Sequence, residues 1–312
     1  MNEVIKNIQE EIEKVVVGKR ESVKNLLLCL LSGGHALLDD IPGVGKTTLA
    51  LSLCRAIALS FCRVQCTPDL MPSDITGFTV YNKQTGQFEY KAGAAVGCHL
   101  LLCDEINRAS GKTQSALLEA MQEEQVTVDG VTRKTESPFM VIATQNRVGS
   151  IGTQPLPYAQ LDRFAMRFSL GYPTAEAEFR LLKDRAEGNP LSSVRAVCST
   201  EEMLSLKEQV KKVTVKDNLY RYIALLAEES RKSALLEIGV SPRACLSALA
   251  LAKANAFYEG RDYCVPQDIR DVFPSACAHR MVLSQKAVSE RKSAESVCYH
   301  ILKEVKVPDD KA

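Results

Sequence analysis

The sequence predicts an α/β fold, with a parallel sheet covered by helices and interrupted by β-hairpin inserts, followed by a smaller all-helical domain. Up to Gly171, short apolar runs alternate with amphipathic helical patterns, and two inserted stretches have the character of hairpins. Beyond residue 190 the pattern is helical only. With 312 residues, of which 46% are apolar, the chain can form two domains. We expect an α/β domain over residues 1–190 and a helical domain over residues 191–312.

The strands of the expected sheet are short apolar runs bounded by polar or glycine-containing turns. Helical patterns such as TTLALSLCRAIALS and TQSALLEAMQEE separate them, and this alternation is typical of parallel strands joined by crossover helices. The expected strands are residues 35–40, 61–66, 99–104, 139–146 and 165–171.

Two stretches do not fit a plain alternating sheet. Residues 71–97 read as a β-hairpin with Gly86 near its turn, and residues 125–135 as a second hairpin with an Asp129-Gly130 turn between alternating strands. Both are expected on one rim of the sheet. The pattern alone is compatible with plain surface loops and with contact surfaces.

Composition excludes several classes of protein. The chain has 39 Lys+Arg against 38 Asp+Glu, and this balanced charge does not favour a surface that binds nucleic acid or a membrane. Its N-terminus is charged throughout, unlike a targeting signal, and no apolar run approaches the roughly 20 residues of a membrane span. The 11 cysteines form no CxxC pair and mostly lie in apolar runs, which is typical of the reducing cytoplasm. Cys62 and Cys66 lack further ligands at useful spacing, so we expect no zinc site.

The stretch DIPGVGKT, residues 40–47, follows an apolar run and opens a helical pattern. Gly43 and Gly45 allow backbone N–H groups to face an anion, Lys46 can neutralise the β- and γ-phosphates, and Thr47 offers a hydroxyl to Mg²⁺. The usual phosphate-loop pattern begins with a glycine where this chain has Asp40. Because that glycine forms the turn and does not donate to phosphate, the loop still predicts a nucleoside triphosphate site.

Carboxylates at the end of the 99–104 strand complete such a site. Asp104 can hold Mg²⁺ through water, and the adjacent Glu105 can act as the base that polarises an attacking water. Asn146 ends the next buried strand and can orient that water or sense the γ-phosphate, although a turn asparagine is common at a strand end.

Two arginines are further candidates. Arg163 follows Asp162 in YAQLDRF, on an expected short helix, where an arginine could reach the γ-phosphate of a neighbouring subunit. Arg243 lies in the first turn of a helix with Ser241 as the expected N-cap. A cation is mildly disfavoured at a helix N-terminus, so an anion is expected nearby.

In order along the chain, DIPGVGKT, DEINRAS, ALLEAMQEEQVTVDG, IATQN, QPLPYAQLDRF, GYPT, SPRA and EGRDYCVPQDI resemble the MoxR family of AAA+ ATPases. The resemblance covers nearly the whole chain. It departs from the commonest pattern at Arg147, where the family more often has proline, and in GSIGTQPLP, which stands for EGTYPLP.

The resemblance implies a ring-forming ATPase, commonly hexameric, that uses ATP and Mg²⁺. It implies Walker A residues Lys46 and Thr47, Walker B residues Asp104 and Glu105, the sensor Asn146, and Thr47 and Asp104 as metal ligands. It also implies that the hairpins line a pore or contact client proteins. The implied nucleotide-binding set is Val17, Gly18, Pro42, Gly43, Val44, Gly45, Lys46, Thr47, Thr48 and Asp104.

The resemblance further implies that Arg163 is an arginine finger and Arg243 a second sensor, which could act on its own nucleotide or on a neighbour's. Family members are regarded as chaperones that remodel partner proteins or insert metal into them, often partners with von Willebrand factor A domains. We therefore expect a homo-oligomer with a client protein, located in the cytoplasm.

Other functions share parts of this pattern. An AAA+ motor acting on DNA is the main alternative, since Arg133 and Lys134 on the second hairpin could meet phosphates; the balanced charge argues against it. A GTPase would need NKxD, and NKQT at residues 82–85 has Thr85 in place of the aspartate. A small-molecule kinase would not need Glu105, and a nucleotide-locked scaffold would need neither hydrolytic acid.

Overall fold

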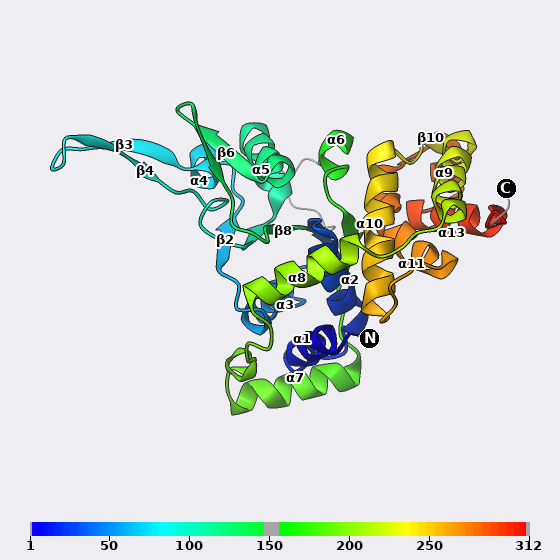
Figure 1. The fold of residues 1–312 in the computed structure, drawn as a ribbon, viewed down its shortest axis with the longest axis horizontal. Coiled ribbons are helices and arrows are strands. Elements are labelled where there is room, and N and C mark those ends of the chain that lie inside the picture. The colour runs from blue at the N-terminus through cyan, green and yellow to red at the C-terminus, as the bar shows by residue number, and fades with distance from the viewer. Residues whose placement is uncertain (1, 147–155, 310–312) are drawn as a thin grey trace.

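The computed structural model describes residues 2–146 and 156–309, and its core is a five-stranded parallel sheet in the order β2-β5-β8-β1-β9 (Figure 1). All the expected strands form, the first four shorter than expected by one or two residues and the last by four. Their bounds are β1 Ala36–Asp39, β2 Phe61–Gln65, β5 Leu100–Asp104, β8 Met140–Gln145 and β9 Met166–Phe168.

Helices cover both faces of this sheet. Leu102 and Ile142 are paired across neighbouring strands and belong to the core formed with α1, α2 and α3. Leu101 and Val141, one residue earlier on the same strands, point to the opposite face and pack with apolar side chains of α5. Strands buried on both faces explain the continuous apolar runs in the sequence. The helix bounds are α1 Glu3–Glu13, α2 Arg20–Ser32, α3 Lys46–Ala56 and α5 Gly111–Glu123.

The first insert differs in part from its prediction. Residues Pro72–Thr76 form a short helix, α4, and the hairpin begins only after it, with β3 Phe78–Asn82 paired to β4 Gln87–Lys91. Proline at the first helical position and the Asp74 carboxylate bonded to the Met71 N–H favour that helix. The hairpin projects away from the body of the molecule (Figure 1).

The second hairpin forms as expected, with β6 Gln125–Val128 paired to β7 Val131–Lys134. Its turn residues Asp129 and Gly130 have φ of 52° and 75°. Two left-handed residues in a two-residue turn match the right-handed twist of the strands, which is why Asp-Gly is favoured there.

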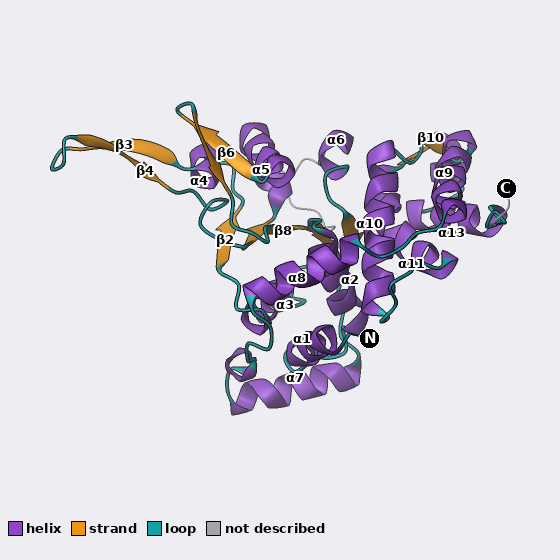
Figure 2. Ribbon diagram, in the orientation of Figure 1, coloured by secondary structure: helices purple, strands orange, loops and turns teal. Residues whose placement is uncertain are grey.

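Beyond α7, Ala175–Glu187, and a 3₁₀ turn at Pro190–Ser193 the chain is mostly helical (Figure 2). One departure is a small antiparallel ladder of β10 Leu236–Ile238 with β11 Val282–Leu283. The apolar core continues across residue 190, so the domain boundary there stays a prediction. The helices are α8 Thr200–Lys211, α9 Asp217–Lys232, α10 Pro242–Tyr258, α11 Pro266–Cys277, α12 Gln285–Ser289 and α13 Ala294–Glu304.

Every helix within residues 2–146 and 156–309 is too short or too polar to cross a bilayer. Arg147 and residues 149–155, most of the stretch that departs from the family pattern, lie outside the described residues.

Candidate functional site

A phosphate-type loop joins β1 to α3. Gly43 and Gly45 have φ of 83° and 95°, a left-handed conformation that glycine adopts without strain. Lys46 is the first residue of α3, so the free N–H groups of the helix N-terminus open toward the loop. The loop borders a pocket of about 340 Å³. Of the expected nucleotide-binding residues, this pocket is lined by Val17, Pro42, Gly43, Val44, Gly45 and Thr48.

Gly18 lies beside this pocket without lining it. A Cβ atom at Gly18 would come within 3.1 Å of the Cβ of Ala177, and its φ is 72°. The glycine therefore lets the 15–19 segment approach α7, which contributes Glu178, Leu181 and Asp184 to the same pocket. The sequence prediction missed the contribution of α7, since nothing in a mostly charged helix indicates a pocket wall.

Lys46 is buried behind the loop. Its Nζ donates to the main-chain carbonyls of Asp40 and Ile41, at 3.1 and 3.2 Å, and to Oδ1 of Asn146 at 3.2 Å. Burial lowers the pKa of Lys46, and the nearby carboxylates, Asp40 foremost, oppose that shift. The structure thus joins the expected phosphate-binding lysine to the expected sensor asparagine.

The two acids at the end of β5 have separate partners. Oδ2 of Asp104 accepts a hydrogen bond from Nε of Arg63 at 2.7 Å, and Oδ1 accepts one from the Thr144 hydroxyl at 3.3 Å. Oε1 of Glu105 accepts from Nδ2 of Asn146 at 2.7 Å. Lys46, Asn146 and Glu105 therefore form one hydrogen-bonded chain across neighbouring strands.

Glu105 carries a backbone conformation that is rare outside glycine, with φ 56° and ψ 51°. Its N–H donates to the Thr144 hydroxyl at 3.0 Å, and its Oε2 accepts from Arg108 at 2.8 Å. Contacts on both main chain and side chain fix the direction of the carboxylate. Sequence analysis missed Arg63 and Thr144 because their contacts depend on the strand order, and it missed Arg108 although that residue lies only three positions after Glu105.

The two predicted Mg²⁺ ligands, Thr47 and Asp104, both carry the oxygen donors that a divalent cation prefers. The Asp104 carboxylate ends a buried strand, and Thr47 is the second residue of α3. One carboxylate and one hydroxyl, with phosphate oxygens and water, are the ligands that Mg²⁺ prefers. These residues fit that ion.

Asp40, the departure from the phosphate-loop pattern, has a structural role. Its buried carboxylate accepts hydrogen bonds from the N–H groups of Leu170 and Gly171, at 2.5 and 3.0 Å, and from Ile41 at 2.9 Å. It thereby ties the end of β1 to the segment that follows β9. A glycine could not make this connection.

Arg163 and Arg243 lie together, apart from the loop. Helix α6, Tyr158–Leu161, ends before Arg163, so this arginine follows the short helix and is not on it as expected. Both arginines line a pocket of about 290 Å³, and among the described residues neither lines the pocket of the phosphate loop. Asp162 lies 3.9 Å from Arg243, and Ser241, the confirmed N-cap of α10, donates to Asp162 at 2.9 Å.

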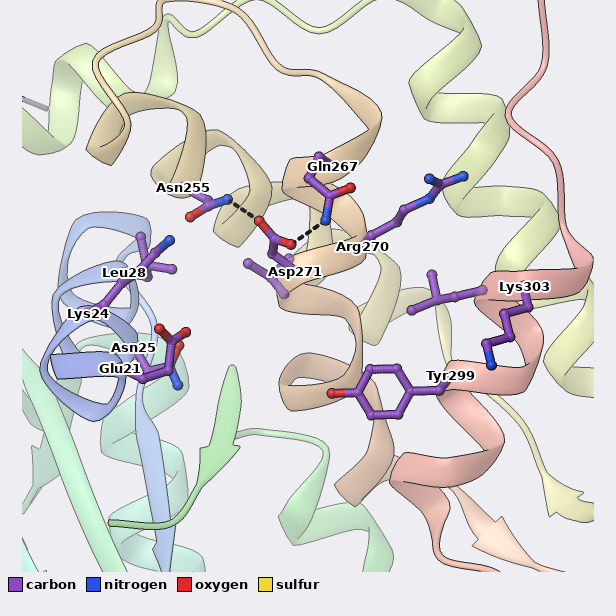
Figure 3. A pocket seen from close by; sticks show the side chains of 12 residues that line it. Glu21, Lys24, Asn25, Leu28, Asn255, Gln267, Arg270, Asp271, Tyr299 and Lys303 are labelled. Atoms are coloured by element: carbon purple, nitrogen blue, oxygen red, sulfur yellow. Dashed lines mark hydrogen bonds between the residues drawn. The ribbon is translucent and has the colours of Figure 1, made fainter. Parts of the chain in front are cut away.

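A larger groove, of about 700 Å³, lies between α2, α11 and α13 (Figure 3). In it Asp271 accepts hydrogen bonds from Asn255 and Gln267, and cationic and anionic side chains are mixed. None of the expected site residues lines it. The groove therefore does not belong to the nucleotide site.

Comparison with known proteins agrees with this geometry. Residues 35–166 match the ATPase family associated with various cellular activities (AAA), and residues 228–301 match the AAA lid domain. A more distant similarity to the Holliday junction branch migration complex subunit RuvB of Picosynechococcus sp. (strain ATCC 27264 / PCC 7002 / PR-6) has 32% identity over 140 residues, covering 42% of this chain and 33% of RuvB.

Longer similarities cover nearly the whole chain. YeaC of Bacillus subtilis (strain 168) is 43% identical, with 96% of this chain and 93% of YeaC covered. Chaperone MoxR1 of Mycobacterium tuberculosis (strain ATCC 25618 / H37Rv) is 38% identical over 96% of this chain and 81% of its own. A crystal structure of a putative ATPase from Cytophaga hutchinsonii ATCC 33406 superposes with a TM-score of 0.90 at 38% identity, covering 98% of this chain and 95% of that one. The chain therefore belongs to the MoxR family of AAA+ ATPases, and it is an ATP hydrolase of the chaperone type.

Proposed function

We propose that this chain hydrolyses ATP at a site completed by a second copy, within a homo-oligomeric ring, commonly of six subunits, that remodels a client protein. The observation that carries the proposal is the separation of the two halves of the site. Lys46 and Glu105 are joined through Asn146, whereas Arg163 and Arg243 line a different pocket. We propose that both arginines act on the nucleotide of a neighbouring subunit, Arg243 included.

In this proposal Lys46 binds the β- and γ-phosphates, and Thr47 and Asp104 hold Mg²⁺, which supplies charge neutralisation at the phosphates. Glu105 accepts the proton of the attacking water, and Asn146 keeps the carboxylate directed through its 2.7 Å hydrogen bond. Arg163 stabilises the charge that develops on the γ-phosphate. The remaining expected nucleotide contacts come from the phosphate loop and the 17–18 segment.

The client surface we propose is the pair of hairpins. Phe88 on β4 is 75% exposed, and Tyr81 on β3 contacts it edge-to-face with ring centroids 5.3 Å apart. Exposed apolar side chains on a projecting element are typical of protein contact sites. In its specific form, the proposal is that the client has a von Willebrand factor A domain and that the ATPase inserts metal into it.

We also propose a cytoplasmic location, which suits 11 free cysteines that are mostly buried.

An AAA+ motor acting on DNA remains the second candidate, favoured only by the distant similarity to RuvB. The guanidinium of Arg133, one of its two candidate phosphate contacts, lies 3.7 Å from the ring centroid of Tyr90 and donates to the carbonyl of Val131 at 3.1 Å. An arginine engaged in this way is less available to a phosphate. The charge balance of the whole chain also argues against this function.

Mixing two inactive variants tests the shared site. Arg163→Ala keeps the phosphate loop, and Lys46→Ala keeps the arginine. We expect each alone to lose turnover, by a factor on the order of 10³ for Arg163→Ala, and an equimolar mixture to recover part of the activity at mixed interfaces. Wild-type activity per subunit should rise with protein concentration. A mixture that stays inactive, together with specific activity that is flat on dilution, would refute the proposal.

The partner class is tested by purifying Glu105→Gln with ATP, a variant that should bind the nucleotide without hydrolysing it. Recovery of one specific protein in stoichiometric amount, absent from a parallel purification of Lys46→Ala, supports the chaperone function. Recovery of nuclease-sensitive DNA instead would favour the motor.

A further inference from the structure

Helix α7 presents an apolar stripe to solvent. Ala175, Phe179, Leu182 and Ala186 recur at i, i+4, i+7 and i+11, so they share one face of the helix. All four are exposed, Phe179 to 62% and Leu182 to 65%. Among the described side chains of α7 only Ala177 is buried. A helix of this amphipathic kind normally buries its stripe against another element.

The opposite face of α7 belongs to the nucleotide pocket. Leu181 and Asp184 line that pocket together with Gly43 and Gly45, and Ala177 lies against Gly18. Anything that covers the exposed stripe therefore lies about one helix diameter, roughly 10 Å, from the nucleotide pocket.

A matching apolar groove lies between α9 and α10. It has a volume of about 390 Å³ and is lined by Tyr220 and Ile223 from α9 and by Cys245, Leu246 and Leu249 from α10. Leu246 is 68% exposed. Its lining on α9 runs from Tyr220 to Arg231, roughly 16 Å of helix, which is comparable with the roughly 20 Å spanned by the 13 residues of α7.

The groove is continuous with the two arginines, because Leu246 also lines the pocket of Arg163 and Arg243. The adjoining pocket carries Lys207, Lys211 and Lys253 against Glu124 and Glu208, and Lys211 is ion-paired with Glu208 at 2.6 Å. With Arg163 and Arg243 counted, the surface around Leu246 has a net positive charge. A triphosphate bound on a second copy has the complementary charge. The stripe and the groove thus each border one half of the proposed shared site.

We propose that α7 of one subunit docks, through Phe179 and Leu182, into the α9–α10 groove of the next subunit. The proposal rests on the shared ATPase site proposed above and specifies its surface. The contact joins two different patches, which lie at opposite ends of the molecule in Figure 1, where α7 is below and the start of α10 is beside α6 above. Such a head-to-tail contact repeats around a ring. A helix in a groove with anchors at i and i+3 is a recurrent way of binding.

Charged substitutions on the two patches test this contact. In a Glu105→Gln background with ATP, we expect Leu182→Glu and Leu246→Glu each to weaken self-association by about tenfold or more, measured by sedimentation velocity. Val288→Glu, at a position on α12 that is also more than half exposed, is the matched control and should assemble like the parent. Circular dichroism and binding of a fluorescent ATP analogue establish that each variant is folded. Leu182→Ser and Leu246→Ser repeat the test if a glutamate variant fails to fold.

The decisive sample is the equimolar mixture of the two patch variants. One interface, between the intact groove of Leu182→Glu and the intact helix of Leu246→Glu, remains sound, so we expect heterodimers that do not grow into rings. Patch variants that assemble like the parent, or a mixture without heterodimers, would overturn the proposed contact. If the Arg163→Ala and Lys46→Ala mixture still recovers activity, the shared site stands and only its surface is wrong. A wild-type chain that never assembles overturns both.

Discussion

Restoring the usual phosphate-loop glycine by Asp40→Gly should destabilise the protein while leaving ATP binding nearly intact. The Asp40 carboxylate accepts hydrogen bonds from the N–H groups of Leu170 and Gly171. These residues are about 130 positions away in sequence, so no neighbour in the chain can take over the contact. The hydrogen bond that Lys46 donates to Asp40 goes to the main-chain carbonyl, at 3.1 Å, and glycine retains that carbonyl. The substitution removes only the charge of the Asp40 carboxylate from the surroundings of Lys46.

The expected loss follows from those hydrogen bonds. Leu170 is buried, so its N–H loses a partner that water replaces poorly, while Gly171 is half-buried. An unsatisfied buried donor costs about 1 to 3 kcal/mol, and for the pair we expect a fall of about 2 to 4 kcal/mol in the free energy of unfolding. The added chain entropy of glycine contributes up to about 1 kcal/mol in the same direction.

Urea unfolding and titration of a fluorescent ATP analogue measure the two effects separately. Affinity should change by no more than about threefold, or about 0.7 kcal/mol. Asp69→Gly, at an exposed turn position, is the control and should have little effect on either quantity. Unchanged stability in Asp40→Gly, or a large loss of affinity without loss of stability, would show that Asp40 serves the nucleotide and not the fold.

Further outcomes follow from the same site. Lys46→Ala should abolish binding of the ATP analogue, whereas Glu105→Gln should bind it and stop phosphate release; equal loss of affinity in both would refute the assigned roles. Removal of divalent cations with EDTA should stop hydrolysis, and added Mg²⁺ should restore it; activity that persists in EDTA would count against the metal. Burial lowers the pKa of His35 to about 4 from 6.5, so the unfolded chain binds a proton that the folded chain does not as pH falls through that window. Stability should drop there by up to about 3 kcal/mol through His35. His35→Gln should make the fall of the urea midpoint with pH shallower without abolishing it, because burial also lowers the pKa of His279; an unchanged profile would exclude His35.

The strands and the phosphate loop were predictable because their signals are local. An apolar run that ends in Asp104 or Asn146 can be identified as a buried strand with a polar end from its own residues alone. The Asp129-Gly130 turn is equally local, since both positions require left-handed backbone. For α4 the signal lies in Pro72 and Asp74, but the stretch 71–97 as a whole predicts a longer hairpin.

The rest depends on the order of the strands and on long-range packing. Arg63 pairs with Asp104 only because β2 lies beside β5, although 41 positions separate them in sequence. Asp40 meets Leu170 across 130 positions for a similar reason. Alternation of strands and helices predicts a parallel sheet but leaves its strand order open.

The projecting hairpins have a consequence for affinity. The rings of Tyr81 and Phe88 contact each other edge-to-face and are exposed, so in the proposed client contact one hairpin would offer a small surface and bind weakly. In a ring each subunit presents the same surface at a fixed spacing, and a client touched by one hairpin meets the next at a high effective concentration. The affinity for a client would then increase with the number of subunits that bind it at the same time. A client would be released once a few hairpins move away from their common spacing.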